Sequence, residues 1–254
     1  MDPSIVSHLR KFQNGVAHRG LHDLTRPENS KAAFIAAIEA NQPFECDIHR
    51  CKNGGLVVCH DSNLLRMCGK EGTIEELTLE EVKENYRLPD GSRLLTLQEL
   101  FALNDKNVPM VLELKSYGGN EHEIVEEALP IIHALPNLDD CLLISFWDEI
   151  LRHARKLGAK LPLGYLVGTE AVKHASPELL REFDFLDVEV HYSLLPRFRK
   201  YRKEGGALLC WTVKGRLTAW IGKWRCHALT WEEVDSAKPK LKLNRYIQKR
   251  FDPR

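Results

Sequence analysis

Eight short apolar segments recur along the chain, and stretches with helical character separate them. Short runs that are rich in branched and aromatic residues predict buried strands. The stretches between them, such as 31–41, 121–135 and 148–157, are predicted to form helices. The predicted strands are 16–20, 44–50, 108–115, 141–146, 163–167, 185–191, 207–213 and 228–230. Strand and helix therefore alternate along the sequence.

This alternation restricts the fold to the α/β class, in which helices cover a parallel sheet. Eight strand–helix units in a chain of 254 residues are typical of a TIM barrel, (β/α)8. An open doubly wound sheet is the alternative, but no Gly-rich phosphate loop follows the first strand. We therefore predict a TIM barrel formed by one domain, residues 1–254, with a small insertion after the second strand. The irregular segment 62–93 is the predicted inserted lobe, and it is expected to lie over the site.

The stretch 44–61 contains the strongest short-range hairpin signal, an Asn53-Gly54 pair between two apolar strands. If the turn centres on this pair, residues whose numbers sum to 107 face each other, so that Asp47 faces His60. Side chains alternate along a strand, and Glu45 therefore shares a face with Asp47. Two carboxylates and an imidazole are expected to converge on one patch. The alternative is an exposed strand face with ordinary polar residues.

Other polar side chains follow the predicted barrel strands at their carboxyl ends. His18 and Arg19 end the first strand, Glu113 and Lys115 end the third, and Trp211 lies near the end of the seventh. In a TIM barrel the chemistry takes place at this end of the strands. The agreement among separate segments favours one site at the mouth of the barrel.

The residue types indicate phosphoester chemistry. Glu45, Asp47 and Glu113 would form an oxygen-rich pocket for one hard divalent cation, Mg²⁺ or Ca²⁺. Arg19 and Lys115 suit an anionic, phosphate-like group.

The predicted catalytic pair is His18 and His60, one as general base and the other as general acid on the leaving alkoxide. Trp211 is expected to be a wall of the substrate pocket, although such a residue also fits a core.

Several of these residues have a purely structural alternative. Lys115 fits a salt bridge to Glu113 or Glu45, and Arg19 fits a partnership with Glu28. Further histidines, His22, His49 and His191, are expected at the rim or in loops, with His49 able to reach the inserted lobe.

Composition excludes some classes of partner. Lys and Arg total 36 and Asp and Glu total 36, so the formal net charge is zero, which argues against nucleic acid as the main partner. No apolar run is long enough for a membrane span, and the first residues lack the apolar core of a signal peptide, so a cytoplasmic protein without stable membrane insertion is expected. The seven cysteines are expected to be buried free thiols in a reducing compartment. Nothing in the pattern fixes an oligomeric state.

These motifs resemble those of the glycerophosphodiester phosphodiesterases. That family has His-Arg-Gly on its first strand, followed by Pro-Glu-Asn-Thr or Pro-Glu-Asn-Ser, Glu-x-Asp, His-Asp and Glu-x-Lys. The matching residues are His18-Arg19-Gly20, Pro27-Glu28-Asn29-Ser30, Glu45-Cys46-Asp47, His60-Asp61 and Glu113-Leu114-Lys115, and Ser145-Phe146 and Trp211-Thr212-Val213 are similar to later family motifs. The resemblance covers residues 16 to 213, and the combination in this order is specific.

The resemblance implies a metal-dependent phosphodiesterase that releases glycerol 3-phosphate and an alcohol from a small-molecule phosphodiester. It implies His18 and His60 as the acid and base, Glu45, Asp47 and Glu113 as metal ligands, and Arg19 and Lys115 as phosphate contacts.

The chain departs from the family pattern at two places. Lys214 stands where the family has Asn, and 228–232 replaces the usual final Ile-Thr-Asp-like motif. These departures leave other substrates open, namely a sugar phosphodiester or a lysophospholipid. An inert barrel that binds a phosphorylated ligand is the alternative outside enzymes. The basic tail 238–254 is expected to be a docking or oligomer segment, or a solvated helix.

Overall fold

The protein is a closed parallel barrel, described by a computed structural model over residues 3–232. Parallel pairing joins neighbouring strands, and β1 pairs with both β2 and β9, which closes the sheet. The eight barrel strands are β1 (Val16–Ala17), β2 (Phe44–Arg50), β4 (Met110–Leu114), β5 (Cys141–Ser145), β6 (Leu163–Val167), β7 (Phe185–Glu189), β8 (Leu208–Val213) and β9 (Ala228–Trp231). The predicted TIM barrel is confirmed.

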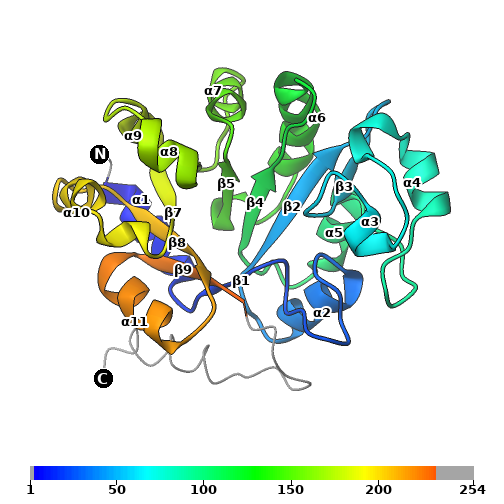
Figure 1. Cartoon of the computed structure of the whole chain (residues 1–254), viewed down its shortest axis with the longest axis horizontal. Helices are drawn as coiled ribbons and strands as arrows, with labels where there is room; N and C mark the ends of the chain where they lie inside the picture. Colours follow the sequence, from blue (N-terminus) through cyan, green and yellow to red (C-terminus); the bar gives the residue numbers. More distant parts are fainter. Residues whose placement is uncertain (1–2, 233–254) are drawn as a thin grey trace.

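Helices surround the barrel (Figure 1). They are α2 (Lys31–Glu39), α5 (Leu97–Leu103), α6 (Glu121–His133), α7 (Asp148–Lys156), α8 (Thr169–His174), α9 (Leu179–Glu182), α10 (Pro196–Lys203) and α11 (Arg216–Arg225), with short 3-10 turns η3 (Leu138–Asp140) and η4 (Tyr192–Leu194). Side chains cap the starts of two of these helices: the Ser30 hydroxyl accepts from the Ala33 N–H at 3.1 Å, and Thr96 and Glu99 form a capping box on α5. Such side chains satisfy N–H groups that a helix start leaves unpaired.

Two hydrophobic clusters fix the barrel. The larger one lies between the sheet and the helices and includes Phe34 of α2 and Phe198 of α10. The second fills the interior of the barrel and includes Phe185, which is fully buried. Gly164 is required beside it, because a Cβ there would lie 2.2 Å from the Phe185 ring.

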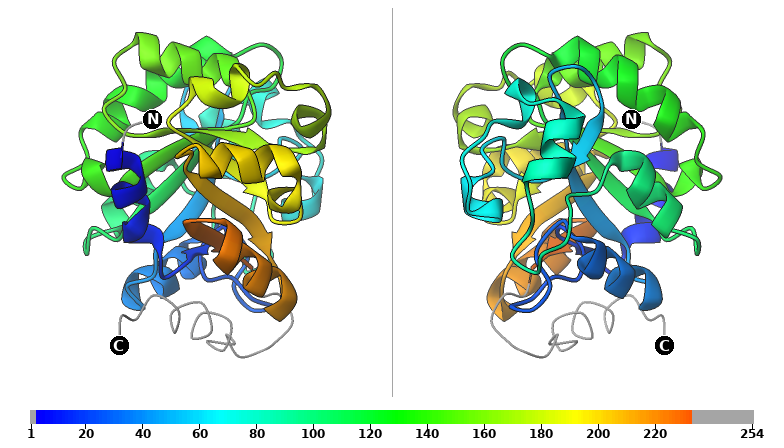
Figure 2. Two further views of the ribbon diagram at one scale, coloured as in Figure 1. Left: turned by 90° about the vertical axis from the view of Figure 1, so that its left-hand side faces the viewer. Right: turned by 90° about the vertical axis from the view of Figure 1, so that its right-hand side faces the viewer.

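The first residues of the chain close the barrel at the end where its strands begin. Helix α1 (Pro3–Leu9) and the turn η1 (Arg10–Phe12) pack Ile5, Leu9 and Phe12 onto the interior cluster. Figure 2 shows α1 across this part of the barrel. The bottom of the barrel is therefore filled, and the opposite end is left for the site.

The hairpin after β2 differs by one residue from the predicted register. Strand β3 (Leu56–Val58) pairs antiparallel with β2, and Ile48 faces Val58, so that facing residues sum to 106 rather than 107. The loop has three residues instead of two, because the Cys51 N–H donates to the Gly55 carbonyl at 2.9 Å and Gly54 adopts φ 93°. Cys59, and not His60, therefore lies opposite Asp47.

Residues 62–93, called the lobe below, follow this hairpin. They form α3 (Leu65–Cys68), η2 (Ile74–Glu76) and α4 (Leu79–Asn85), to one side of the barrel in Figure 1. The lobe has a hydrophobic cluster of its own, in which Leu64, Ile74 and Val82 pack against Val57 of β3. The insertion expected in the fold is present, while the assignment of the whole chain to one domain stays a prediction.

The cysteine prediction is wrong for one pair. Cys210 of β8 and Cys226, the residue after α11, are joined in a disulfide with a Cα–Cα distance of 6.1 Å. The chain leaves β8, runs through α11 and returns to the neighbouring strand β9, which brings these positions together. The other five cysteines are free, and four of them are buried.

In the part of the chain that the structure describes, no helix is long and apolar enough to cross a membrane. The tail 238–254, for which a docking or oligomer segment or a solvated helix is expected, lies outside the described residues.

Candidate active site

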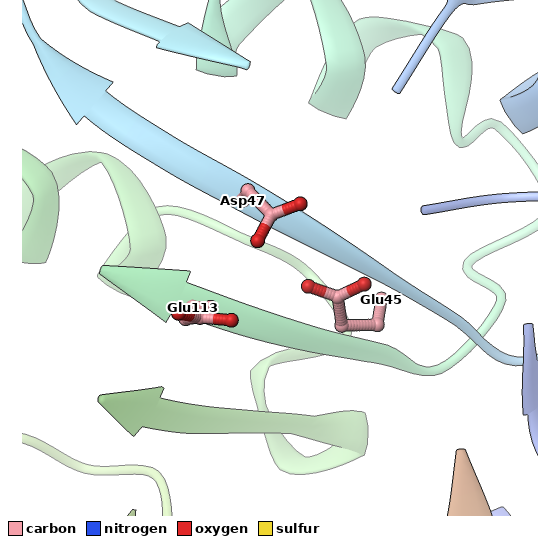
Figure 3. Close-up of side chains that lie close together, drawn as sticks. All are labelled: Glu45, Asp47 and Glu113. Atoms are coloured by element: carbon pink, nitrogen blue, oxygen red, sulfur yellow. The ribbon is translucent and has the colours of Figure 1, made fainter. Parts of the chain in front are cut away.

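Three buried carboxylates meet where β2 and β4 lie side by side. Asp47 is the register partner of Glu113, and Glu45 lies two residues earlier on the same face of β2. Ligand atoms of all three side chains lie within 4.8 Å of one another. Figure 3 shows the three groups pointing toward one another from the two strands. The predicted convergence of these residues is therefore observed.

Burial and the local charges give the three carboxylates different pKa values. Burial, together with repulsion by Asp47 and Glu113, raises the pKa of Glu45 well above its ordinary value. Burial also raises the pKa of Glu113 to about 7, against the charge of Lys115. At Asp47 burial would raise the pKa, but the charges of Lys115 and Arg19 outweigh it and hold the pKa below its usual range. Without a cation, the cluster therefore retains protons near neutral pH.

Chelator-treated protein is expected to become more stable as the pH falls from above 7 to below 4.5. The folded pKa of Glu113 lies above its unfolded value, so the folded state binds the proton more tightly and protonation stabilises it. We expect a gain on the order of 2 kcal/mol from this group. Urea unfolding over this pH range measures it, and Glu113→Gln should lack this component. An equal pH dependence in the variant would contradict the assignment.

Two cations border the carboxylates. Lys115 Nζ lies 2.6 Å from Glu113 Oε1 and 3.0 Å from Asp47 Oδ1. Arg19 Nε lies 3.4 Å from Asp47 Oδ2, and Arg19 Nη1 lies 2.7 Å from Glu28 Oε1. The structural partnerships considered for Lys115 with Glu113 and for Arg19 with Glu28 are both present. Both cations nevertheless line the cavity described below.

The loop after β1 is held against the carboxylates by unusual backbone. Arg19 adopts φ 53° and Asn29 adopts φ 54°, in the left-handed region that is uncommon for residues other than glycine and less so for Asn than for Arg. The Arg19 N–H donates to Glu45 Oε2 at 2.9 Å, and Asn29 Nδ2 donates to Asp47 Oδ2 at 2.7 Å. Gly20 is needed between them, because it has φ 80° and a Cβ would lie 3.0 Å from Ala33. Backbone of this kind persists where surrounding contacts impose it.

His18 is oriented by a carboxylate from the far end of the described chain. Its Nδ1 lies 3.0 Å from Glu232 Oε2, and its Nε2 lies 4.0 Å from Glu45 Oε2. Burial would raise the pKa of Glu232, but the hydrogen bond with His18 lowers it to about 2. Because an ionised carboxylate only accepts hydrogen bonds, Nδ1 carries the proton. Burial lowers the pKa of His18, so a neutral ring presents the Nε2 lone pair to the cavity.

His60, which lines the same cavity as His18, is also oriented by a carboxylate. Its Nδ1 lies 2.6 Å from Asp61 Oδ1, and burial lowers its pKa. His49 supports the loop that carries it, because His49 Nε2 donates to the His60 carbonyl at 3.1 Å. The other ring nitrogen of His49 lies 2.6 Å from Glu75 of the lobe. His49 therefore reaches the lobe, as expected from the sequence.

A cavity of about 490 Å³ opens between these groups. Every predicted site residue lines it except Asp47, which lies behind and contacts Lys115 and Arg19. Trp211 forms part of the wall, with its ring edge-on to Phe146 at 5.6 Å. His22 lies outside the lining, 4.0 Å from Glu232, and His191 is an exposed loop residue. The structure thus gathers the predicted set at one mouth.

The sequence prediction missed two buried polar groups in the wall of the cavity. Asp187 of β7 and Thr230 of β9 are 1% and 2% exposed, and each has a side-chain oxygen without a hydrogen-bond partner in the described residues. Burial, and the nearby Glu113, raise the pKa of Asp187 well above its ordinary value. A polar residue on the inward face of an apolar strand, as in the Phe185 to Glu189 segment, was the signal that could have identified Asp187.

The rim of the cavity is closed by groups to which the sequence analysis assigned no role in the site. Arg66 of the lobe lies 2.7 Å from Glu28 and also pairs with Asp61. Lys214, where the family has Asn, lies 3.5 Å from Glu232. Both departures from the family pattern therefore meet beside His18.

Comparison with known proteins identifies the chain. Residues 18–236 match the glycerophosphoryl diester phosphodiesterase family. The chain belongs to this family. It is therefore an enzyme of the phosphoric diester hydrolase class. A glycerophosphodiester phosphodiesterase of Caldanaerobacter subterraneus subsp. tengcongensis is 30% identical over 212 residues, which cover 78% of this chain and 84% of that protein.

Solved structures of two phosphodiesterases have a fold similar to that of this chain. The glycerophosphodiester phosphodiesterase from Parabacteroides distasonis superposes with a TM-score of 0.75 at 22% identity, covering 93% of this chain and 97% of that chain. A phosphodiesterase from Oleispira antarctica, in complex with the product sn-glycerol-3-phosphate, has a TM-score of 0.77 at 23% identity, covering 93% and 96%. At this identity the two structures support the barrel fold.

Proposed function

We propose that the protein is a metal-dependent phosphodiesterase that hydrolyses glycerophosphodiesters to glycerol 3-phosphate and an alcohol. One observation carries this proposal: a three-carboxylate cluster and two carboxylate-oriented histidines border the same cavity. The names of the relatives and the glycerol 3-phosphate bound to the Oleispira antarctica enzyme support the same substrate class.

The carboxylate cluster fits one divalent cation, Mg²⁺ or Ca²⁺. Three buried oxygen donors lie close together, and Glu45 Oε1 has no hydrogen-bond partner in the described residues. Hard cations prefer oxygen ligands of this kind. When bound, the cation neutralises charge that develops on the phosphoryl oxygens. Glu45, Asp47 and Glu113 are the residues that would hold it.

Arg19 and Lys115 are proposed to bind the phosphoryl group. Both line the cavity, and the Asp47 carboxylate between them keeps their positive groups fixed. The attraction of Asp47 and Glu113 raises the pKa of Lys115 against the effect of burial, so it stays charged. Cations that are already oriented stabilise a transferring phosphoryl group without the cost of rearrangement.

His18 and His60 are proposed as the acid and base. Each places Nδ1–H on a carboxylate and leaves Nε2 toward the cavity, which is the state of a general base. Hydrolysis needs one proton removed from the attacking oxygen and one given to the leaving alkoxide. The second histidine therefore acts in the protonated form, which its neighbour Asp61 or Glu232 stabilises.

The remaining wall suits a small polyol. Asp187 and Thr230 offer oxygens that have no hydrogen-bond partner among the described residues, while Trp211 and Phe146 offer ring surfaces. Buried groups of this kind favour a ligand that completes their hydrogen bonds over an analogue that does not. A sugar phosphodiester or a lysophospholipid is the second candidate substrate class, because Lys214 and Glu232 change the rim.

Hydrolysis of a panel of glycerophosphodiesters, with and without EDTA, tests the proposal. Turnover is expected to require Mg²⁺ or Ca²⁺, to stop in EDTA and to return when metal is added back. Product analysis should find glycerol 3-phosphate, and sugar phosphodiesters and lysophospholipids in the same panel rank the alternatives. A folded, metal-binding protein that turns over no panel member would point instead to an inert barrel that binds phosphorylated ligands.

A further inference from the structure

Positive charge is concentrated in one part of a chain that is neutral as a whole. Residues 196–231 contain nine Lys and Arg residues and one acidic residue, Glu204, although the whole chain has 36 of each kind. This segment includes α10 and α11, which lie side by side on one face (Figure 2, left). Arg202 of α10 joins them by donating to the carbonyl of Trp224 at 2.6 Å.

A cationic groove runs between these helices. It has a volume of about 280 Å³ and is lined by Arg199, Arg202, Lys203 and Arg225, and none of its lining residues within 3–232 is a carboxylate. Glu204, the one acidic residue of the segment 196–231, pairs with Arg181 and Lys200 instead. Within residues 3–232, Arg199, Lys203 and Arg225 form no ion pair with a carboxylate. Among the described residues, these three side chains therefore present positive charge that no carboxylate balances.

The same face exposes large apolar side chains. Leu217, Trp220 and Trp224 of α11 are 70%, 53% and 63% exposed, and their spacing places them along one stripe of the helix. The opposite stripe packs inward through Ala219 and Gly222. Single exposed apolar residues are common, but a stripe beside a charged groove marks an interaction surface.

We propose that the α10–α11 face, defined by Arg199, Lys203, Arg225, Leu217 and Trp220, docks on an anionic phospholipid bilayer. Tryptophan side chains favour the boundary between headgroups and acyl chains, and basic side chains are attracted to anionic headgroups. Helix α11 carries no acidic residue that would oppose this. The charge and the apolar stripe together fit a bilayer surface.

Other occupants fit less well. Nucleic acid would match the groove but would not cover an aliphatic side chain such as Leu217. A second copy of the chain that docked through the same face would place positive charge against positive charge. Residues 233–254 contain seven basic and three acidic residues, so this segment also does not complement the face in charge.

Docking would bring the cavity mouth to the lipid. Lys214, which lines the catalytic cavity, lies three residues before Leu217 on the chain. Lys214 contacts Glu232, and Glu232 lies 4.0 Å from His22 on the loop that also carries Leu24, which is 74% exposed. The apolar side chains thus begin at the rim of the cavity. Docking itself does not depend on the proposed reaction, so binding and turnover are measured separately.

Co-sedimentation of the full-length protein with vesicles tests the proposal. Vesicles of phosphatidylcholine alone are compared with vesicles that also contain phosphatidylglycerol, at low and high salt. Binding is expected only to the anionic vesicles and is expected to weaken at high salt. Tryptophan fluorescence should shift to the blue when these vesicles are added.

Matched variants locate the surface. Leu217→Ser with Trp220→Ser, and separately Arg199→Glu with Lys203→Glu, are each expected to lower the vesicle partition coefficient by about tenfold or more. Leu157→Ser with Lys173→Glu changes an exposed apolar and a basic residue elsewhere and should leave binding unchanged. Circular dichroism and turnover of soluble glycerophosphocholine show that each variant is folded.

Several results would overturn the proposal. One is the absence of binding to anionic vesicles. Another is binding that survives in both face variants and is lost only when residues 233–254 are removed, which would assign it to that segment. Retention of a DNA oligonucleotide without vesicle binding would identify a nucleic-acid surface. A dimer that dissociates in the Leu217→Ser and Trp220→Ser variant, again without vesicle binding, would identify a contact between copies.

Discussion

Replacement of His18 by alanine is expected to lower kcat for glycerophosphocholine by about 10²–10⁴-fold, and His60→Ala is expected to do the same. Each residue presents a ring nitrogen to the cavity from a fixed carboxylate partner, and neither residue holds the proposed cation. KM should change little, because the lost interaction belongs to proton transfer rather than to ground-state binding. Steady-state kinetics at saturating metal measure both parameters.

The leaving group distinguishes the two histidines. A phosphodiester that releases p-nitrophenol needs little help from an acid, so the variant that lacks the general acid should recover much of its rate on that substrate. Glu232→Gln is the graded control, because it keeps the shape of the His18 partner and removes its charge, and it should cost less than His18→Ala. Wild-type kcat in either alanine variant would exclude that residue as acid or base.

Asp47→Asn and Glu45→Gln are expected to change stability in opposite directions in protein treated with chelator. Asp47 is fully buried and pairs with Lys115 and Arg19, so its neutralisation leaves buried cations uncompensated. Removal of one partner from such a cluster destabilises by about 3–5 kcal/mol. At Glu45 the neighbouring carboxylates already oppose the charge, and an amide relieves that repulsion.

Urea unfolding in EDTA measures these changes in the free energy of unfolding. Both variants should also lose metal-dependent turnover, so activity alone would not separate them. Addition of Ca²⁺ should raise the free energy of unfolding of the wild type, and it should raise that of the Glu45→Gln variant less. Equal destabilisation by the two substitutions would show that Glu45 is not under repulsion from Asp47 and Glu113.

The barrel and most of the site were predictable because they rest on short-range patterns. Alternation of strand and helix limits the fold, and residues that follow parallel strands must meet at one edge of the sheet. Predicting that Glu45, Asp47 and Glu113 converge therefore required no long-range information beyond the order of the strands. Their proposed roles stay predictions, while their convergence is observed.

Features that depend on loop geometry or on distant pairing were not predictable. The hairpin register depended on Gly54, whose positive φ adds a third residue to the loop. Glu232 reaches His18 across 214 residues without a local signal. Cys210 and Cys226 are paired through a crossover whose end positions the sequence pattern does not fix.

The lobe has a consequence for how this enzyme could change over evolutionary time. Its cluster around Leu64, Ile74 and Val82 is separate from the two clusters that hold the barrel, so substitutions within 62–93 act on a different packing unit. Yet the lobe places Arg66 at the cavity rim and Glu75 against His49. Substrate range can therefore diversify in this segment while the stability of the catalytic scaffold is conserved, and a randomised library confined to 62–93 is the natural route to new diester preferences.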